Sequence, residues 1–90
     1  MTEAWDPLKA AANIRKHGVR FPDAVGVLHD PLAVKVAETE VDGEVRTAVV
    51  GTDSLGRVLV VVYTQRADSV RLISARRATR GERVDYEEGI

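Results

Sequence analysis

Two neighbouring segments in the second half of the chain constrain the fold most. Residues 58–64, Val-Leu-Val-Val-Val-Tyr-Thr, form a continuous run of mainly β-branched apolar residues, and residues 70–77 form a second run after a short break. The first run is too apolar for a surface strand, so we predict that it is a central strand buried on both faces. Residues 66–68, Arg-Ala-Asp, predict a tight connection to the second strand.

The second of these strands carries charged side chains. Because side chains alternate along a strand, we expect Arg71 to point to the same side as Ile73 and Ala75. Leu72 and Ser74 would then point to the other side. A guanidinium beside core residues is costly unless it is paired or faces an anion at the rim of the sheet. This strand is therefore the first candidate for a functional surface.

The N-terminal third predicts two helices. The first begins at Asp6-Pro7, because the Asp carboxylate can cap free backbone amides and Pro fits the first helical position. It continues over residues 8–17 and ends at Gly18, a residue that readily adopts the left-handed C-terminal cap. Residues 21–23 begin the second helix and Asp30-Pro31 end it. Its predicted buried face consists of Phe21, Ala24, Val25 and Leu28.

From residue 32 onward the pattern is typical of strands and turns. Residues 32–37 have weak strand character, 38–44 form an acidic segment that we interpret as a hairpin turn, and 44–50 alternate partly. A turn at 51–56 precedes the central strand. Thr79 and Glu82 form a capping box, which predicts a short helix from Arg80 to about Glu88. We therefore expect one α+β domain over residues 1–90: two helices, three or four antiparallel strands, and a C-terminal helix.

Composition narrows the class of protein. The chain has no cysteine, which excludes disulfides and thiolate-metal sites. Two histidines without a nearby acidic cluster argue against a metal site, so we expect neither a metal nor another cofactor. No apolar run is long enough to span a membrane and the N-terminus has no signal pattern, so we expect no membrane contact and a cytoplasmic location.

The net charge of −1 hides an uneven distribution. Residues 66–83 contain six arginines and two acidic residues, a local balance of +4, whereas acidic residues gather at 38–44. Ten of the thirteen basic residues are arginine, which favours bidentate contacts with phosphate or carboxylate. A solvated, salt-bridged surface is the alternative explanation for any single arginine.

The remaining chemistry is metal-free and uses basic side chains. Phosphate loops, HExxH, GxSxG and cysteine nucleophiles are absent. RNA can be cleaved without a metal, since its own 2′-hydroxyl attacks the adjacent phosphorus while arginines stabilise the added charge. An imidazole near neutral pKa can move the protons, and lysine or tyrosine can replace it. These groups are available in the sequence, namely in His17, Lys16, Tyr63 and the arginines of 71–77.

Several motifs resemble those of one family. They are Trp5-Asp6-Pro7, Lys16-His17-Gly18-Val19, Tyr63-Thr64 and Arg71-Leu72-Ile73-Ser74-Ala75-Arg76-Arg77-Ala78, and the likeness runs from Trp5 to Tyr86. Together they resemble the BrnT toxins, which are ribonuclease toxins of type II toxin–antitoxin modules with a RelE-like fold. The resemblance implies cleavage of RNA that arrests translation and growth. It also implies neutralisation by a cognate BrnA-like antitoxin in a toxin–antitoxin hetero-oligomer, with DNA contacted only through the antitoxin.

We assign candidate roles on this basis. The predicted catalytic residues are His17, Lys16, Arg46, Arg71 and Arg76, and the predicted RNA-binding residues are Lys9, Tyr63, Arg77 and Arg80. Alternatively, His17 could have only a structural role, as a cation that interacts favourably with the C-terminal end of the helix dipole, and Tyr63 could be an aromatic side chain packed in the core. Arg76 and Arg77 should project oppositely, one facing phosphate and the other pairing with a glutamate of the last helix. Asn13 is expected to make a structural bond between helices.

Two other classes of function stay open at this point. The basic face could belong to a non-catalytic module that docks an acidic partner protein or nucleic acid. A DNA-binding regulator is the weaker alternative, because no helix here is basic enough to enter a groove. One departure from the family pattern affects folding only: Arg20 stands where many relatives have Ser or Thr, so the second helix should lack a side-chain N-cap.

Overall fold

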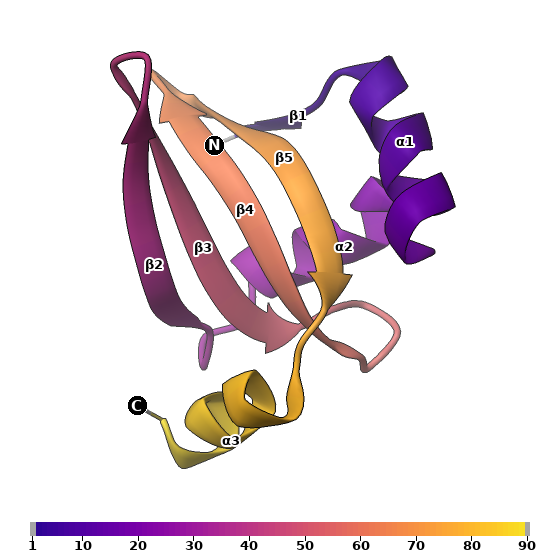
Figure 1. The fold of residues 1–90 in the computed structure, drawn as a ribbon, viewed down its shortest axis with the longest axis vertical. Helices are drawn as coiled ribbons and strands as arrows, with labels where there is room; N and C mark the ends of the chain where they lie inside the picture. The colour runs from indigo at the N-terminus through magenta and orange to yellow at the C-terminus, as the bar shows by residue number, and fades with distance from the viewer. Residues whose placement is uncertain (1, 90) are drawn as a thin grey trace.

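The structure, a computed structural model, describes residues 2–89. Three helices flank a five-stranded sheet in which the strands are ordered β1-β5-β4-β3-β2 (Figure 1). The elements in chain order are β1 (Thr2–Ala4), α1 (Pro7–His17), α2 (Phe21–Leu28), β2 (Val34–Val41), β3 (Glu44–Thr52), β4 (Val58–Arg66), β5 (Ser69–Arg77) and α3 (Arg80–Glu88). The α+β class and the positions of the three helices are as predicted.

The sheet has one strand more than expected and is not purely antiparallel. β1 pairs in parallel with β5, with Thr2 opposite Ser69 and Ala4 opposite Arg71. A strand of three residues is too short to show alternation, and it exists only because β5 offers a free edge. The prediction of three or four antiparallel strands is therefore wrong at this edge.

The outer strand β2 is also longer than expected. The predicted strand covered 32–37 and the predicted turn 38–44, but β2 continues to Val41, with Glu40 opposite Val45 on β3. Pairing with β3 holds the acidic residues in the strand, so the turn shrinks to Asp42 and Gly43. Both have positive φ, 51° and 79°, as a two-residue hairpin turn requires.

The two N-terminal helices begin and end as predicted. The Asp6 side chain accepts a hydrogen bond of 2.8 Å from the backbone N–H of Leu8, and Gly18 has the left-handed φ of 70°. Arg20 provides no side-chain cap for α2, also as expected. The fully buried face of α2 differs, because Val27 lies in the core while the predicted Val25 and Leu28 are only partly buried.

One large core lies between the sheet and the first two helices. Its buried members come from both layers and are Val19, Phe21, Ala24, Val27, Leu59, Val61, Val70, Leu72 and Ala75. Trp5 packs its ring edge-on against Phe21, with ring centroids 5.9 Å apart. Burial of β4 on both faces is confirmed at residues 59–61, whereas Val62 is only partly buried. In Figure 1, α2 passes behind the sheet and α1 stands beside β5.

A β-bulge in β5 changes which face its side chains occupy. Val62 on β4 lies opposite Ser74, but the next residue, Tyr63, lies opposite Leu72, so Ile73 is an extra residue. Leu72 and Ala75 consequently both face the core. The expectation that Arg71 shares a face with Ala75 is wrong, because alternation is interrupted between them.

We call the sheet face opposite the core the open face, and it carries Arg46, Thr64, Arg71, Ser74 and Arg76. α3 covers only one end of it. The Tyr86 hydroxyl contacts the Thr52 hydroxyl at 2.9 Å and donates to the Asp30 carboxylate at 2.6 Å. Burial alone would raise the pKa of Asp30, but the hydrogen bonds from the Thr52 N–H and Tyr86 outweigh it and lower that pKa.

In residues 2–89, no helix is both long and apolar enough to cross a membrane.

Candidate functional site

Two arginines form a row across the open face. Thr64 on the central strand pairs with Arg46 on β3 and with Arg71 on β5. Neighbouring strands lie about 4.8 Å apart, so the backbones of the two arginines are separated by roughly 10 Å. Thr64 is buried between them and donates its hydroxyl hydrogen to the Val45 carbonyl at 2.9 Å. Thr64 therefore lies between the backbones of two arginines on the same face of the sheet.

These two arginines are not neutralised by strong ion pairs. Within residues 2–89, no carboxylate lies within 4 Å of the Arg71 guanidinium. Arg46 Nε is 3.9 Å from Glu44 and is a buried nitrogen without a hydrogen-bond partner among the described residues. Glu44 instead accepts a 2.7 Å hydrogen bond from Arg66, which lowers the pKa of Glu44. The row therefore keeps positive charge available for an anion.

Arg76 shares the open face but is already paired. Two of its nitrogens donate to the two carboxylate oxygens of Glu82, each at 2.8 Å. Arg76 lies opposite Val60, four residues along β4 from Thr64 and thus about 13 Å from the row. Arg77 projects to the other face. The expectation that one of these two arginines pairs with a glutamate of the last helix is confirmed, and that arginine is Arg76.

The pair between Arg76 and Glu82 predicts acid sensitivity. The hydrogen bonds from Arg76 lower the pKa of Glu82 to about 2. A lowered pKa stabilises the fold above pH 4.5, the ordinary value, and that contribution disappears as the pH falls toward 2. We expect Glu82→Gln to reduce the free energy of unfolding by about 1–2 kcal/mol at pH 7. This is less than the full pKa shift implies, because the Arg76 side chain is 40% exposed.

Urea unfolding at pH 7 and pH 2.5 measures this contribution. The difference between Glu82→Gln and the parent should shrink at the lower pH, whereas Glu87→Gln, an exposed change on the same helix, should show none at either. An equal loss at both pH values would mean that the Glu82 side chain acts through the hydrogen bond it accepts from the Thr79 N–H rather than through its pairing with Arg76.

Three basic residues of α1 lie beside β5. Lys9, Lys16 and His17 line a pocket of about 260 Å³ together with Ala12, Asn13, Ile73 and Ser74. Ser74 belongs both to this pocket and to the open face, so the pocket adjoins the arginine-bearing surface. The positive charge of Lys9 also helps to lower the pKa of Glu44, after the larger effect of the Arg66 hydrogen bond. His17 is partly buried in the last turn of α1.

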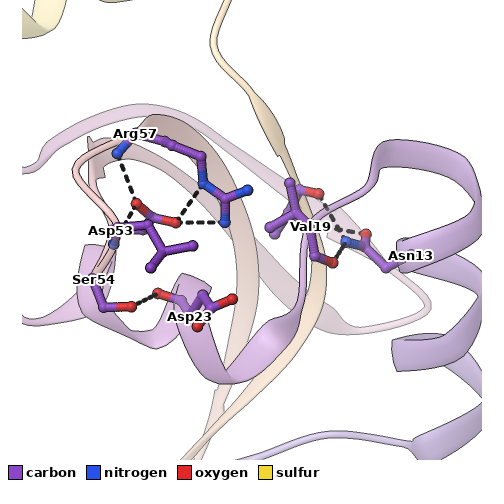
Figure 2. A network of polar contacts seen from close by, with 8 residues as sticks. Asn13, Val19, Asp23, Asp53, Ser54 and Arg57 are labelled. Atoms are coloured by element: carbon purple, nitrogen blue, oxygen red, sulfur yellow. Dashed lines mark hydrogen bonds and ion pairs between the residues drawn. The ribbon is translucent and has the colours of Figure 1, made fainter.

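Asn13 fixes this helix against the strand. Its side-chain amide donates to the carbonyls of Val19 and Ala75, both at 2.9 Å, and its oxygen accepts from the Ala75 N–H at 3.0 Å. Figure 2 shows the amide between α1 and the neighbouring backbone. The Asn13 amide thus satisfies the backbone N–H and carbonyl of Ala75, which a neighbouring strand would otherwise satisfy at this edge of β5. Its predicted structural role is confirmed, although the bonds run to a loop and a strand rather than to a second helix.

The other predicted residues lie elsewhere. Tyr63 is on the core side of the sheet and packs partly buried against the core. Arg77 lines a pocket at the far end of β5 with Arg57 and Arg83, and Arg80 lines a neighbouring one. Thr64 and Ser74 belong to motifs noted in the sequence but were given no role in the site, because only the strand register and the bulge place them on the open face. Among residues 2–89, no three His, Asp or Glu side chains gather to hold a metal ion.

This arrangement suits an anionic ligand. Two guanidiniums that form no hydrogen bond with a carboxylate can bind a phosphate and stabilise charge that develops on it, while an imidazole and two ammonium groups lie in the adjoining pocket. Such a set can bind a nucleic-acid backbone and can also move protons at the phosphate.

Comparisons with known proteins point the same way. A family model described as "Ribonuclease toxin, BrnT, of type II toxin-antitoxin system" matches residues 5–82. Among solved structures, the crystal structure of the Brucella abortus ribonuclease toxin BrnT is 25% identical in sequence and superimposes with a TM-score of 0.67. The match covers 89% of this chain and 100% of that one. A comparison with curated proteins found no match.

Proposed function

The chain belongs to the BrnT family of ribonuclease toxins of type II toxin–antitoxin systems, and we propose that it is a metal-independent endoribonuclease of the cytoplasm. Cleavage of cellular RNA would arrest translation and growth. A single toxin domain, RelE-like in fold, would carry the whole site. The observation that carries the proposal is the row of Arg46 and Arg71 over Thr64, in which neither arginine is held by a strong ion pair.

The proposed reaction is in-line attack by the substrate's own 2′-hydroxyl. A base removes the 2′-hydroxyl proton, the 2′-oxygen bonds to phosphorus, and the bond from phosphorus to the 5′-oxygen breaks as an acid protonates that oxygen. The products are a 2′,3′-cyclic phosphate and a 5′-hydroxyl. Arg46 and Arg71 stabilise the charge on the pentacoordinate phosphorus. His17 and Lys16 supply the proton transfers, Lys9 holds the substrate backbone, and Arg76 orients α3 beside the site.

The products and the effect of a chelator test this reaction. Purified toxin should cleave single-stranded RNA equally well with and without EDTA and leave 2′,3′-cyclic phosphate ends. An RNA with 2′-O-methyl groups throughout should bind and stay intact, because its 2′-oxygen cannot attack. Loss of cleavage in EDTA, or 5′-phosphate ends, would contradict the proposal. Binding without any cleavage of ordinary RNA would support the alternative of a basic docking module.

The family implies an antitoxin, and we propose that a BrnA-like antitoxin lays an acidic or apolar segment across the open face in a hetero-oligomer. Such a segment would satisfy Arg46 and Arg71 and exclude RNA at the same time. Contact with DNA would come only from the antitoxin. We expect raising NaCl from about 0.1 to 1 M to weaken toxin–antitoxin affinity by roughly tenfold or more. Calorimetry that finds no dependence on salt would exclude these arginines from the interface.

A further inference from the structure

A second group of arginines surrounds a small pocket away from the open face. The pocket has a volume of about 280 Å³. Its lining residues come from the β3–β4 loop, the end of β5 and α3, and Figure 1 shows where these elements lie. Its lining residues are Gly56, Arg57, Val58, Arg77, Ala78 and Arg83. The backbone N–H of Ala78 donates to the Val58 carbonyl at 3.0 Å, which ties two walls of the pocket together. No residue that we place in the cleavage site lines it.

Arg57 is held rigidly at the edge of this pocket. The buried Asp53 carboxylate accepts from the N–H groups of Leu55 and Arg57 through Oδ1, at 3.0 and 2.8 Å. Its Oδ2 accepts from Arg57 Nε and Nη2, at 2.9 and 2.7 Å (Figure 2). Both nitrogens on one edge of the guanidinium are thus engaged, whereas Nη1 has no hydrogen-bond partner within residues 2–89. Arg57 therefore offers a donor in a fixed position.

Arg77 and Arg83 supply the uncompensated charge. Both side chains are exposed, and neither forms an ion pair with a carboxylate of the described residues. Asp53 balances the charge of Arg57, so the pocket carries about two net positive charges. Two exposed guanidiniums and one fixed donor around the same pocket match the several oxygens of a phosphate. A pocket of this volume holds a phosphate with part of a sugar, but not a helix or strand of a protein.

We propose that this pocket binds one phosphate of the RNA backbone and anchors the substrate away from the cleaved bond. The inference rests on the proposed function and extends it from the cleaved phosphate to a second one. Arg71 lies opposite Thr64 and Arg77 opposite Leu59, five residues apart along β4, which corresponds to roughly 17 Å. An RNA strand several nucleotides long is needed to occupy both places, so the toxin would favour such strands over dinucleotides.

The salt dependence of binding tests the proposal without any cleavage. The probe is a fluorescent ten-nucleotide RNA carrying 2′-O-methyl groups throughout. We expect the double variant Arg77→Ala/Arg83→Ala to bind it about tenfold more weakly than the parent. Because one phosphate contact is lost, the slope of log affinity against log salt should fall in magnitude by about 0.7. Arg15→Ala, which removes an exposed arginine from α1, is the matched control and should change neither.

Each outcome bears on the pocket separately from the cleavage reaction. A parent-like affinity and slope in the double variant would overturn the assignment. The assignment would also be overturned if the double variant binds the probe normally but binds the antitoxin more weakly, because the pocket would then contact the protein partner. If ordinary RNA is never cleaved but the double variant still loses one phosphate contact, the cleavage mechanism fails and the pocket stands. Thermal unfolding followed by circular dichroism verifies that both variants remain folded.

Discussion

Replacing Arg71 by alanine is expected to lower the rate of RNA cleavage by about 10²- to 10³-fold. The Arg71 guanidinium is exposed on the open face, has no carboxylate partner among the described residues, and faces Arg46 across Thr64. In the proposed reaction, removing it takes away a donor that acts on charge present mainly in the transition state. Cleavage of a labelled RNA under single-turnover conditions measures the loss, and growth after induction of the variant reports it in cells.

Three further variants serve as comparisons for this result. Arg46→Ala should produce a loss of similar size, and Arg15→Ala none. Arg76→Ala should reduce cleavage less than Arg71→Ala does, because Arg76 is engaged by Glu82 and lies about 13 Å from the row. Folding should stay intact in Arg71→Ala, whereas antitoxin binding should weaken, because the proposed antitoxin segment contacts Arg71. If both single variants, Arg71→Ala and Arg46→Ala, keep full activity, the cleaved phosphate lies elsewhere.

The features that the sequence predicts well are those encoded by neighbouring residues. The caps of α1 at Asp6 and Gly18, and the capping box of Thr79 and Glu82 in α3, all form as expected, because each joins atoms within a few residues. The central position of β4 follows from its continuous apolar composition. β1 escaped prediction because three residues become a strand only through pairing with β5, more than sixty residues away.

The candidate site depends on the β-bulge in β5, which no local sequence pattern predicts. Arg71 and Arg76 are five residues apart, so strict alternation would place them on opposite faces of the sheet. The bulge at Ile73 brings them to the same face and turns Leu72 and Ala75 together into the core. Composition did indicate that this strand is basic. Of these two arginines, Arg76 is paired because Glu82 of α3 forms an ion pair with it, and Arg71 is left without such a partner among the described residues.

The largest effect on stability is expected from Asn13→Leu, which should lower the free energy of unfolding by about 3 kcal/mol and the melting temperature by roughly 15 °C. Asn13 is only 5% exposed and makes three hydrogen bonds to the backbone of Val19 and Ala75. Leucine fills a similar volume but leaves those backbone groups buried and unpaired. Ala11→Leu, an added side chain on the exposed part of α1, is the control and should change the melting temperature little.

The same variant separates a structural role of α1 from its role in the site. Asn13 holds α1 to the edge of β5 and lines the same pocket as Lys16, His17 and Ser74, so we expect its loss to shift the two basic side chains. Cleavage measured well below the melting temperature, and corrected for the folded fraction, should therefore still fall in Asn13→Leu. If the folded variant cleaves as fast as the parent, the α1 pocket contributes nothing to the reaction, and Arg46 and Arg71 must act with another proton donor. A loss of stability below about 1 kcal/mol would instead show that water replaces the amide at little cost.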